Sequence, residues 1–141
     1  MVATGQVPAD LEIPGAAHLT TSDQFLELDE LPRRILFIGG GYIAFEFAHV
    51  AALAGSQVTV LHRGPRPLSL FDPDLVDQLV QRTRELGIDV HLGTEAIGIE
   101  KSSAQLSAGL QYFFHSGKVA GSGVGVGVPA QDGFDAVAQL V

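Results

Sequence analysis

Residues 35–63 are ILFIGGGYIAFEFAHVAALAGSQVTVLHR, and this stretch decides the fold. Its first four residues are apolar and uncharged, as in a parallel strand that is buried on both faces. Three glycines follow at once, and then an alanine-rich helical segment, 42–54, that stops before Gly55. A second apolar strand, 57–61, completes the unit. The stretch therefore predicts strand, tight turn, helix and parallel strand within about 30 residues.

The glycines have the spacing Gly39-x-Gly41-x-x-Ala44, which is the G-x-G-x-x-G/A pattern of dinucleotide-binding turns. Gly39 permits the tight turn out of the strand, and Gly41 lets a pyrophosphate approach the backbone. Ala44 is small enough for the helix to lie close on the sheet. The free N–H groups and the positive dipole end of the helix would attract the phosphates. The alternative is a glycine-rich turn in another kind of α/β protein.

The end of the second strand indicates which dinucleotide is bound. A carboxylate there would accept hydrogen bonds from the ribose 2′-hydroxyl of NAD or FAD. His62 takes that place, Arg63 and Arg66 follow it, and no carboxylate lies between Gly55 and Asp72. Guanidinium groups suit a 2′-phosphate. We therefore favour NADP(H) over NAD(H) and disfavour FAD in this turn; the alternative is that the two arginines are ordinary solvated charges.

The flanking segments extend the unit on both sides. Thr21-Ser22-Asp23-Gln24 fits a capping box for a short helix to about Leu28. Asp72 and Pro73 suit the start of a second long helix, whose apolar residues repeat at helical spacing. Residues 88–92 predict a third parallel strand, and 94–101 a fourth, antiparallel one.

These elements predict an α/β fold, a Rossmann-like β-α-β-α-β half of a doubly wound parallel sheet. In such a sheet the carboxyl ends of parallel strands meet at one edge. The glycine turn, 39–41, and the basic segment, 62–66, would then lie together at that edge, where a dinucleotide binds.

The stretch GGGYIAFEFA followed by VTVLHRG resembles the pyridine nucleotide-disulfide oxidoreductases, the family of glutathione reductase, mercuric reductase and dihydrolipoamide dehydrogenase. Specifically, it is similar to the NAD(P)H-binding domain of these flavoproteins. The similarity starts at Ala3-Thr4-Gly5, which resembles the segment that closes the family's FAD domain. It continues through 71–74 to about Glu100, roughly two thirds of the chain.

The resemblance implies a role for each matching residue. The turn would line the pyrophosphate, Tyr42 would cover the flavin until nicotinamide displaces it, and Glu46 would lie near the nicotinamide carboxamide. Apart from the family, Tyr42 and Glu46 share one helical face, and simple packing and a solvated surface are the alternatives. The segment after the second strand would meet the 2′-phosphate. The expected cofactor-binding residues are Gly39, Gly41, Tyr42, Ile43, Ala44, Glu46, His62, Arg63 and Arg66, with Thr4 and Gly5 on the FAD side.

The expected domains follow from the same comparison. Residues 1–30 resemble the end of an FAD domain and a linker, and residues 31–101 form the NAD(P)H-binding domain. Residues 102–141 are expected to be a divergent or disordered tail, because 119–128 reads VAGSGVGVGV and does not specify a strand register. A shifted reading frame over 102–128 is one explanation, and Leu110–His115 is one candidate strand.

Composition excludes several classes of function. The 141 residues include no cysteine, which removes disulfides, thiolate metal sites and dithiol chemistry from this chain, and five histidines show no metal-ligand spacing. The net charge of −8 opposes binding to nucleic acid or an anionic membrane. No segment has the length of a membrane span or the pattern of a signal peptide, so a cytoplasmic location is the default expectation.

The predicted function is the NADP(H)-binding portion of an FAD-dependent oxidoreductase that transfers hydride from NADPH to flavin. The dinucleotide is the expected partner, and no catalytic residue or metal ligand is expected in this chain. Family members are homodimers, but the sequence lacks their dimerisation domain, their FAD fingerprint and their redox cysteines. The alternative is a non-catalytic nucleotide-binding module or an inactive truncated gene product.

Overall fold

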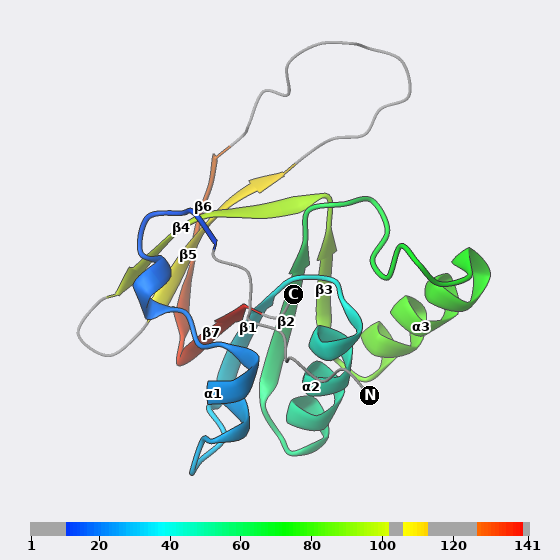
Figure 1. Ribbon diagram of the computed structural model, residues 1–141, viewed down its shortest axis with the longest axis horizontal. Coiled ribbons are helices and arrows are strands. Elements are labelled where there is room, and N and C mark those ends of the chain that lie inside the picture. The colour runs from blue at the N-terminus through cyan, green and yellow to red at the C-terminus, as the bar shows by residue number, and fades with distance from the viewer. Residues whose placement is uncertain (1–10, 102–105, 113–126, 140–141) are drawn as a thin grey trace, which may run out of the picture.

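The computed structural model describes residues 11–101, 106–112 and 127–139 (Figure 1). Strands and helices alternate over residues 34–92, as the glycine-centred pattern predicts. In chain order the elements are η1 (Ala16–His18), α1 (Ser22–Leu26), β1 (Arg34–Ile38), α2 (Tyr42–Leu53), β2 (Gln57–His62), α3 (Pro73–Glu85), β3 (Asp89–Leu92), β4 (Thr94–Lys101), β5 (Leu106–Tyr112), β6 (Gly127–Phe134) and β7 (Ala136–Gln139).

The central sheet is parallel, with strand order β3-β2-β1-β7 in the described residues. Ile35 of β1 pairs with Val58 on one side and with Ala136 on the other. Since all four strands run the same way, their carboxyl ends share one edge of the sheet. A second sheet, with order β4-β5-β6, is antiparallel and lies at the upper left of Figure 1.

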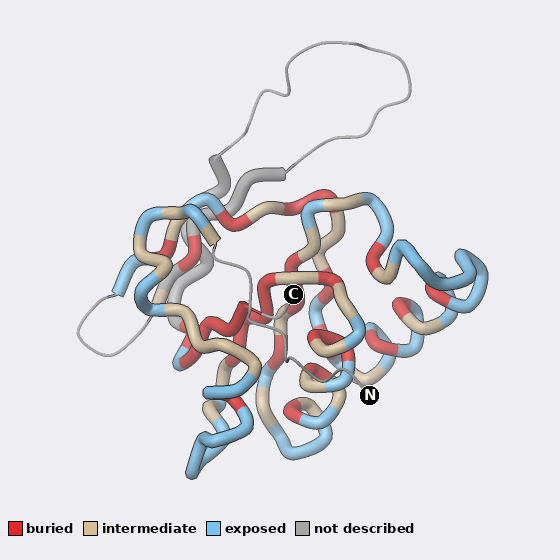
Figure 2. Tube along the Cα trace, viewed as in Figure 1, coloured by how far each residue is buried: buried red, intermediate tan, exposed pale blue. Residues whose placement is uncertain are grey.

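The molecule has three layers: the helices, the parallel sheet and the antiparallel sheet. Strand β1 lies in the middle layer and is apolar on both faces. Ile35 and Phe37 are fully buried against the helices, in a core that α1, α2 and α3 share. Leu36 and Ile38 point the other way, into a second core with residues of β4, β5 and β6. Figure 2 shows the buried residues concentrated in the parallel strands and on the inner faces of the helices. This double burial explains the uncharged run at the start of the stretch.

The starts of α1, α2 and α3 follow the sequence prediction. Thr21 and Gln24 form the predicted capping box of α1, which ends at Leu26, before the expected Leu28. Asp72 caps α3 by accepting from the N–H groups of Asp74 and Leu75, with Pro73 at the first helical position. Helix α2 begins at Tyr42, and no side chain caps it at the N-cap residue Gly41, so its first N–H groups are free as predicted.

The segment after residue 101, expected to be a divergent or disordered tail, contains three strands in its described residues. Strand β7 joins the parallel sheet beside β1, so the sheet has one more strand than the predicted β-α-β-α-β unit. Strand β5 starts and ends earlier than the candidate strand Leu110–His115. The predicted strand 94–101 is confirmed as antiparallel, but it belongs to the second sheet. The glycine-rich stretch up to residue 126 lies outside the described residues, and the proposed domain boundaries stay a prediction.

Candidate nucleotide-binding cleft

A cleft of about 550 Å³ lies at the carboxyl edge of the parallel sheet. It is within the size range of small-molecule and cofactor sites. The ends of β1, β2 and β7, the glycine turn, the loop after β2 and the start of β4 form its walls. The lining residues are Leu11, Ile38, Gly39, Gly40, Gly41, Tyr42, Leu61, His62, Arg63, Leu68, Ser69, Leu70, Phe71, Thr94, Glu95, Ala96 and Gln139.

The glycine turn lines this cleft with all three of its residues, 39–41. Gly39 has φ +131°, a conformation that favours glycine, and its N–H donates to the carbonyl of Leu61 on β2 over 2.9 Å. Gly41 has φ −83°, and a Cβ at this position would meet no atom within 4 Å. The space beside Gly41 is therefore open for a ligand to approach the backbone.

The open start of α2 completes a site suited to an anion. The first N–H groups of a helix have no partner within the helix, and here no side chain accepts from them. Ala44 is fully buried, which confirms the predicted close packing of α2 on the sheet. Ile43, between Tyr42 and Ala44, packs partly against the helix-side core. Backbone donors and the helix dipole thus point toward the space beside Gly41.

The loop after β2, residues 63–71, closes one side of the cleft and is tied to the glycine turn. The N–H of Leu68 donates to the carbonyl of Gly40 over 2.9 Å, although Leu68 has a left-handed φ of +51°. The N–H of Gly93 donates to the carbonyl of Gly64 over 2.9 Å, which joins the same loop to the end of β3. The loop is therefore fixed from two directions, and Leu68 keeps a strained conformation at the cleft wall.

His62 lies in a slot between two glycines. A Cβ on Gly40 would come within 2.6 Å of its Cγ, and a Cβ on Gly64 within 2.7 Å of its Nε2. The Nε2 atom is 3.0 Å from the carbonyl oxygen of Arg66. Burial lowers the pKa of His62; the hydrogen bond to Arg66 opposes this shift, and the charge of Arg63 reinforces it.

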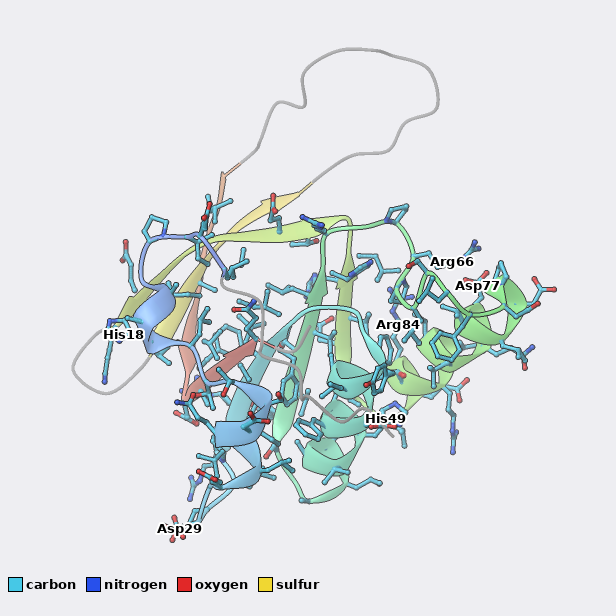
Figure 3. All side chains as sticks on the ribbon, viewed as in Figure 1. His18, Asp29, His49, Arg66, Asp77 and Arg84 are labelled. Atoms are coloured by element: carbon cyan, nitrogen blue, oxygen red, sulfur yellow. The ribbon has the colours of Figure 1, made fainter. Side chains whose placement is uncertain are left out.

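The two arginines occupy different places. Arg63 is exposed and lines the cleft. Arg66 is not a lining residue, because its guanidinium turns to α3, where Nε is 3.1 Å from Oδ1 of Asp77 and Nη2 is 3.0 Å from Oδ2. Figure 3 shows Arg66 and Asp77 together at the α3 end of the molecule. The structure brings Arg63 and His62 to the glycine turn but leaves Arg66 outside the cleft.

Tyr42 and Glu46 lie beside the cleft rather than deep within it. Tyr42 is 59% exposed and lines both the cleft and an adjoining groove of about 270 Å³ between α2 and α3. Glu46 lines only the groove, one helical turn along the same face. His49 follows at the next turn. The expected FAD-side residues Thr4 and Gly5 lie outside the described residues.

The opposite wall of the cleft contains residues that sequence reasoning missed. Thr94, Glu95 and Ala96 come from the start of β4, and Gln139 comes from the end of β7. Ser69 lines the cleft in the loop that also contains Arg66. Only the rule that a site lies beyond the carboxyl ends of the strands could have pointed to Gln139, and that rule required knowing that β7 belongs to the sheet.

Other features of the surface are less suited to a ligand. A depression of about 630 Å³ lies beside α3, but its lining includes no residue of the glycine turn. In the part of the chain that the structure describes, no group of three or more histidine or acidic side chains is placed to hold a metal ion. The helices among the described residues are also too short or too polar to cross a membrane.

Comparison with known proteins agrees with this geometry. The family model for pyridine nucleotide-disulphide oxidoreductases matches residues 1–133. A glutathione reductase of Burkholderia cepacia is 39% identical over 110 residues, which cover 78% of this chain and 24% of that protein. A mercuric reductase of Staphylococcus aureus is 33% identical over 109 residues, covering 76% and 20% respectively.

Among solved structures, the HOCl-induced flavoprotein disulfide reductase of Escherichia coli superposes with a TM-score of 0.73 at 28% identity. This match covers 96% of the present chain and 28% of that one. The chain thus spans about a quarter of the length of the relatives it matches. Sequence and fold lead to the same conclusion: the chain belongs to the pyridine nucleotide-disulphide oxidoreductases, a family of FAD- and NAD(P)H-dependent enzymes.

Proposed function

We propose that this chain is the NADP(H)-binding portion of an FAD-dependent oxidoreductase of the pyridine nucleotide-disulfide type. The observation that carries the proposal is the composition of the cleft. The open glycine turn and the uncapped start of α2 face the same space as Arg63, and His62 replaces the acid expected for a ribose 2′-hydroxyl.

The residues of the cleft suit the two ends of a dinucleotide. The pyrophosphate lies against Gly41, where nothing obstructs the backbone, and accepts hydrogen bonds from the first N–H groups of α2. The adenosine 2′-phosphate meets the exposed guanidinium of Arg63, which can donate two parallel hydrogen bonds. The nicotinamide end would then extend toward Tyr42, and Glu46 in the adjoining groove would accept from the carboxamide.

NADPH supplies the hydride, and the chain's own residues bind and orient it. The exposed ring of Tyr42 at the mouth of the cleft can stack on a planar ring and shield it from water. The flavin and the final acceptor enter the proposal through the family, since these residues match only about a quarter of each relative.

Calorimetric titration with NADPH and with NADH tests the proposal. The wild-type chain should prefer NADPH, and Arg63→Ala should remove most of that preference, because a charge-assisted hydrogen bond contributes about 1.5–3 kcal/mol, or roughly 10-fold to 150-fold in affinity. Arg33→Ala is the matched control. Arg33 is exposed and precedes β1, at the opposite edge of the sheet, so its removal should leave both affinities unchanged.

Each outcome has a separate meaning. Equal binding of NADPH and NADH would retain the nucleotide cleft and reject the assignment to NADP(H). Failure of a folded chain to bind either nucleotide would reject the proposed function as a whole. A similar loss in Arg33→Ala and Arg63→Ala would show that the effect comes from net charge and not from a phosphate contact.

A further inference from the structure

The second glycine of the turn, Gly40, occupies a position that the dinucleotide-binding pattern leaves free for any residue. Its backbone does not have a positive φ, so conformation does not explain the glycine. The reason lies across the sheet edge: any Cβ on Gly40 would collide with the ring of His62. Gly64 shows the same relationship from the other side of the ring. Two glycines that are distant in sequence thus form a slot for one imidazole.

The hydrogen bond of His62 gives the ring a direction. A carbonyl oxygen only accepts, so the Nε2–H of His62 donates to Arg66 across 3.0 Å. The Nε2 atom is therefore already engaged and turned toward the loop. Burial favours the neutral ring and lowers its pKa, which further reduces its value as a cation for a phosphate.

The ring of His62 links the glycine turn to the loop after β2. It fills the space that a Cβ on Gly40 or on Gly64 would need, and it donates to the carbonyl of Arg66. Arg63 lies between His62 and Gly64, so both of its neighbours are fixed by the same contact. The hydrogen bond from the N–H of Leu68 to the carbonyl of Gly40 is a second link between the loop after β2 and the glycine turn. The position of Arg63 relative to the pyrophosphate site therefore depends on this ring.

We propose that His62 is a positioning residue: a neutral wedge between Gly40 and Gly64 that holds Arg63 over the glycine turn, rather than a ligand of the 2′-phosphate. The inference rests on the proposed function, since it concerns how this cleft prefers NADPH. It also explains why the free position of the motif is glycine in this chain.

Substitution of His62 distinguishes a positioning role from direct binding of the 2′-phosphate. His62→Ala should weaken NADPH binding about 10-fold and change NADH binding less than about threefold, because the loop that carries Arg63 loses its anchor. His62→Gln should restore NADPH affinity to within about threefold of wild type, since its amide can donate to the carbonyl of Arg66 without ever being charged. If glutamine loses as much as alanine, His62 acts through its charge and the proposal is wrong.

A double-mutant cycle tests the slot itself. Gly40→Ala should displace the ring and weaken NADPH binding as His62→Ala does. The double variant Gly40→Ala/His62→Ala should be no weaker than His62→Ala alone, because the collision is then gone. Losses that simply add would show that Gly40 and His62 act separately and would overturn the proposal.

Thermal unfolding of the same four proteins gives a readout that does not need a nucleotide. Gly40→Ala should lower the unfolding midpoint, and His62→Ala should relieve most of that loss in the double variant. This coupling would be seen even if the wild-type chain bound no nucleotide, so failure of the proposed function and failure of the wedge are distinguishable. If Gly40→Ala leaves the midpoint unchanged, the ring does not occupy the slot.

Discussion

Arg66 and Asp77 form a two-point ion pair outside the candidate nucleotide-binding cleft, with donor–acceptor distances of 3.1 and 3.0 Å. The pair links the loop after β2 to α3, and both side chains are about half exposed or more, at 49% and 61%. Arg66 was expected from the sequence to meet the 2′-phosphate, an expectation that stays a prediction. Its partner on α3 makes it less available for that contact than Arg63.

The first prediction therefore separates the two arginines. Arg66→Ala should change NADPH affinity less than about threefold, whereas Arg63→Ala should cost about 10-fold or more. The exposed pair contributes about 0–1 kcal/mol to folding, so Arg66→Ala should also leave stability nearly unchanged. Titration of both variants with NADPH is the measurement. Equal losses would mean that Arg66 leaves Asp77 to meet the phosphate.

Gly41→Ala is expected to impair binding without impairing folding. The backbone of Gly41 is in an ordinary extended conformation, and a Cβ there meets nothing within 4 Å. The added methyl group projects into open space at the turn where the pyrophosphate is proposed to lie. NADPH and NADH affinities should both fall about 10-fold or more, while the free energy of unfolding changes by about 0.5 kcal/mol or less.

Gly55→Ala is the complementary control for this prediction. Gly55 follows α2 with φ +100°, far along the helix from the cleft. Alanine there should cost about 1 kcal/mol of stability and leave both nucleotide affinities unchanged. Wild-type affinity in Gly41→Ala would mean that the pyrophosphate does not lie against this backbone.

The elements around the glycine turn were predictable because their signals are local. The uncharged run of β1, the glycine spacing and the caps of α1 and α3 all lie within a few residues of the structure they specify. Strand β7 was not predictable in this way. Its sequence, AVAQ, is short and made mostly of small residues, and its place depends on β1 about 100 positions earlier. The reciprocal backbone bonds of Arg34 and Asp135, one of them through the aspartate side chain, help to align the two strands.

The same distinction between local and long-range signals applies to the residues of the candidate site. Gly39, Gly41 and Arg63 could be placed in the cleft from the motif, since turn and second strand lie in one unit. The wall formed by β4 and Gln139 could not, because it comes from strands that meet the cleft only through the sheet order. Two further features depend on side-chain packing, which residue spacing does not predict. They are the ion pair of Arg66 with Asp77 and the collision that a Cβ on Gly40 would cause.

A side-chain hydrogen bond between His49 of α2 and Thr83 of α3 leads to a prediction about stability. Thr83 is fully buried, and its hydroxyl donates to the carbonyl of Leu79 over 2.7 Å. The same oxygen lies 2.8 Å from Nε2 of His49, so it accepts from that ring nitrogen. Thr83→Val keeps the shape but removes both bonds, and should cost about 1–2 kcal/mol. Urea unfolding measures this loss.

Thr59→Val provides the comparison for Thr83→Val. Thr59 is half-buried on β2, outside the link between the helices, and valine suits a strand. The change should be close to neutral or slightly stabilising. If Thr83→Val is also neutral, the hydroxyl does not join α2 to α3, and packing alone holds the two helices.

The last prediction concerns the pH dependence of stability through His62. Burial lowers the pKa of this histidine below its ordinary value of 6.5, so the unfolded chain binds a proton more readily than the folded chain. Stability from this group is therefore fully present above about pH 7.5 and is lost as the pH falls below 6.5 through the folded-state pKa. Urea unfolding of wild type and His62→Gln between about pH 5 and pH 8 isolates the effect, since the other histidines are common to both. The difference in unfolding free energy should be constant at the upper end and should shift against the wild type at the lower end. Parallel curves over the whole range would mean that the ring has the same proton affinity in both states, and that the slot between Gly40 and Gly64 does not bury it.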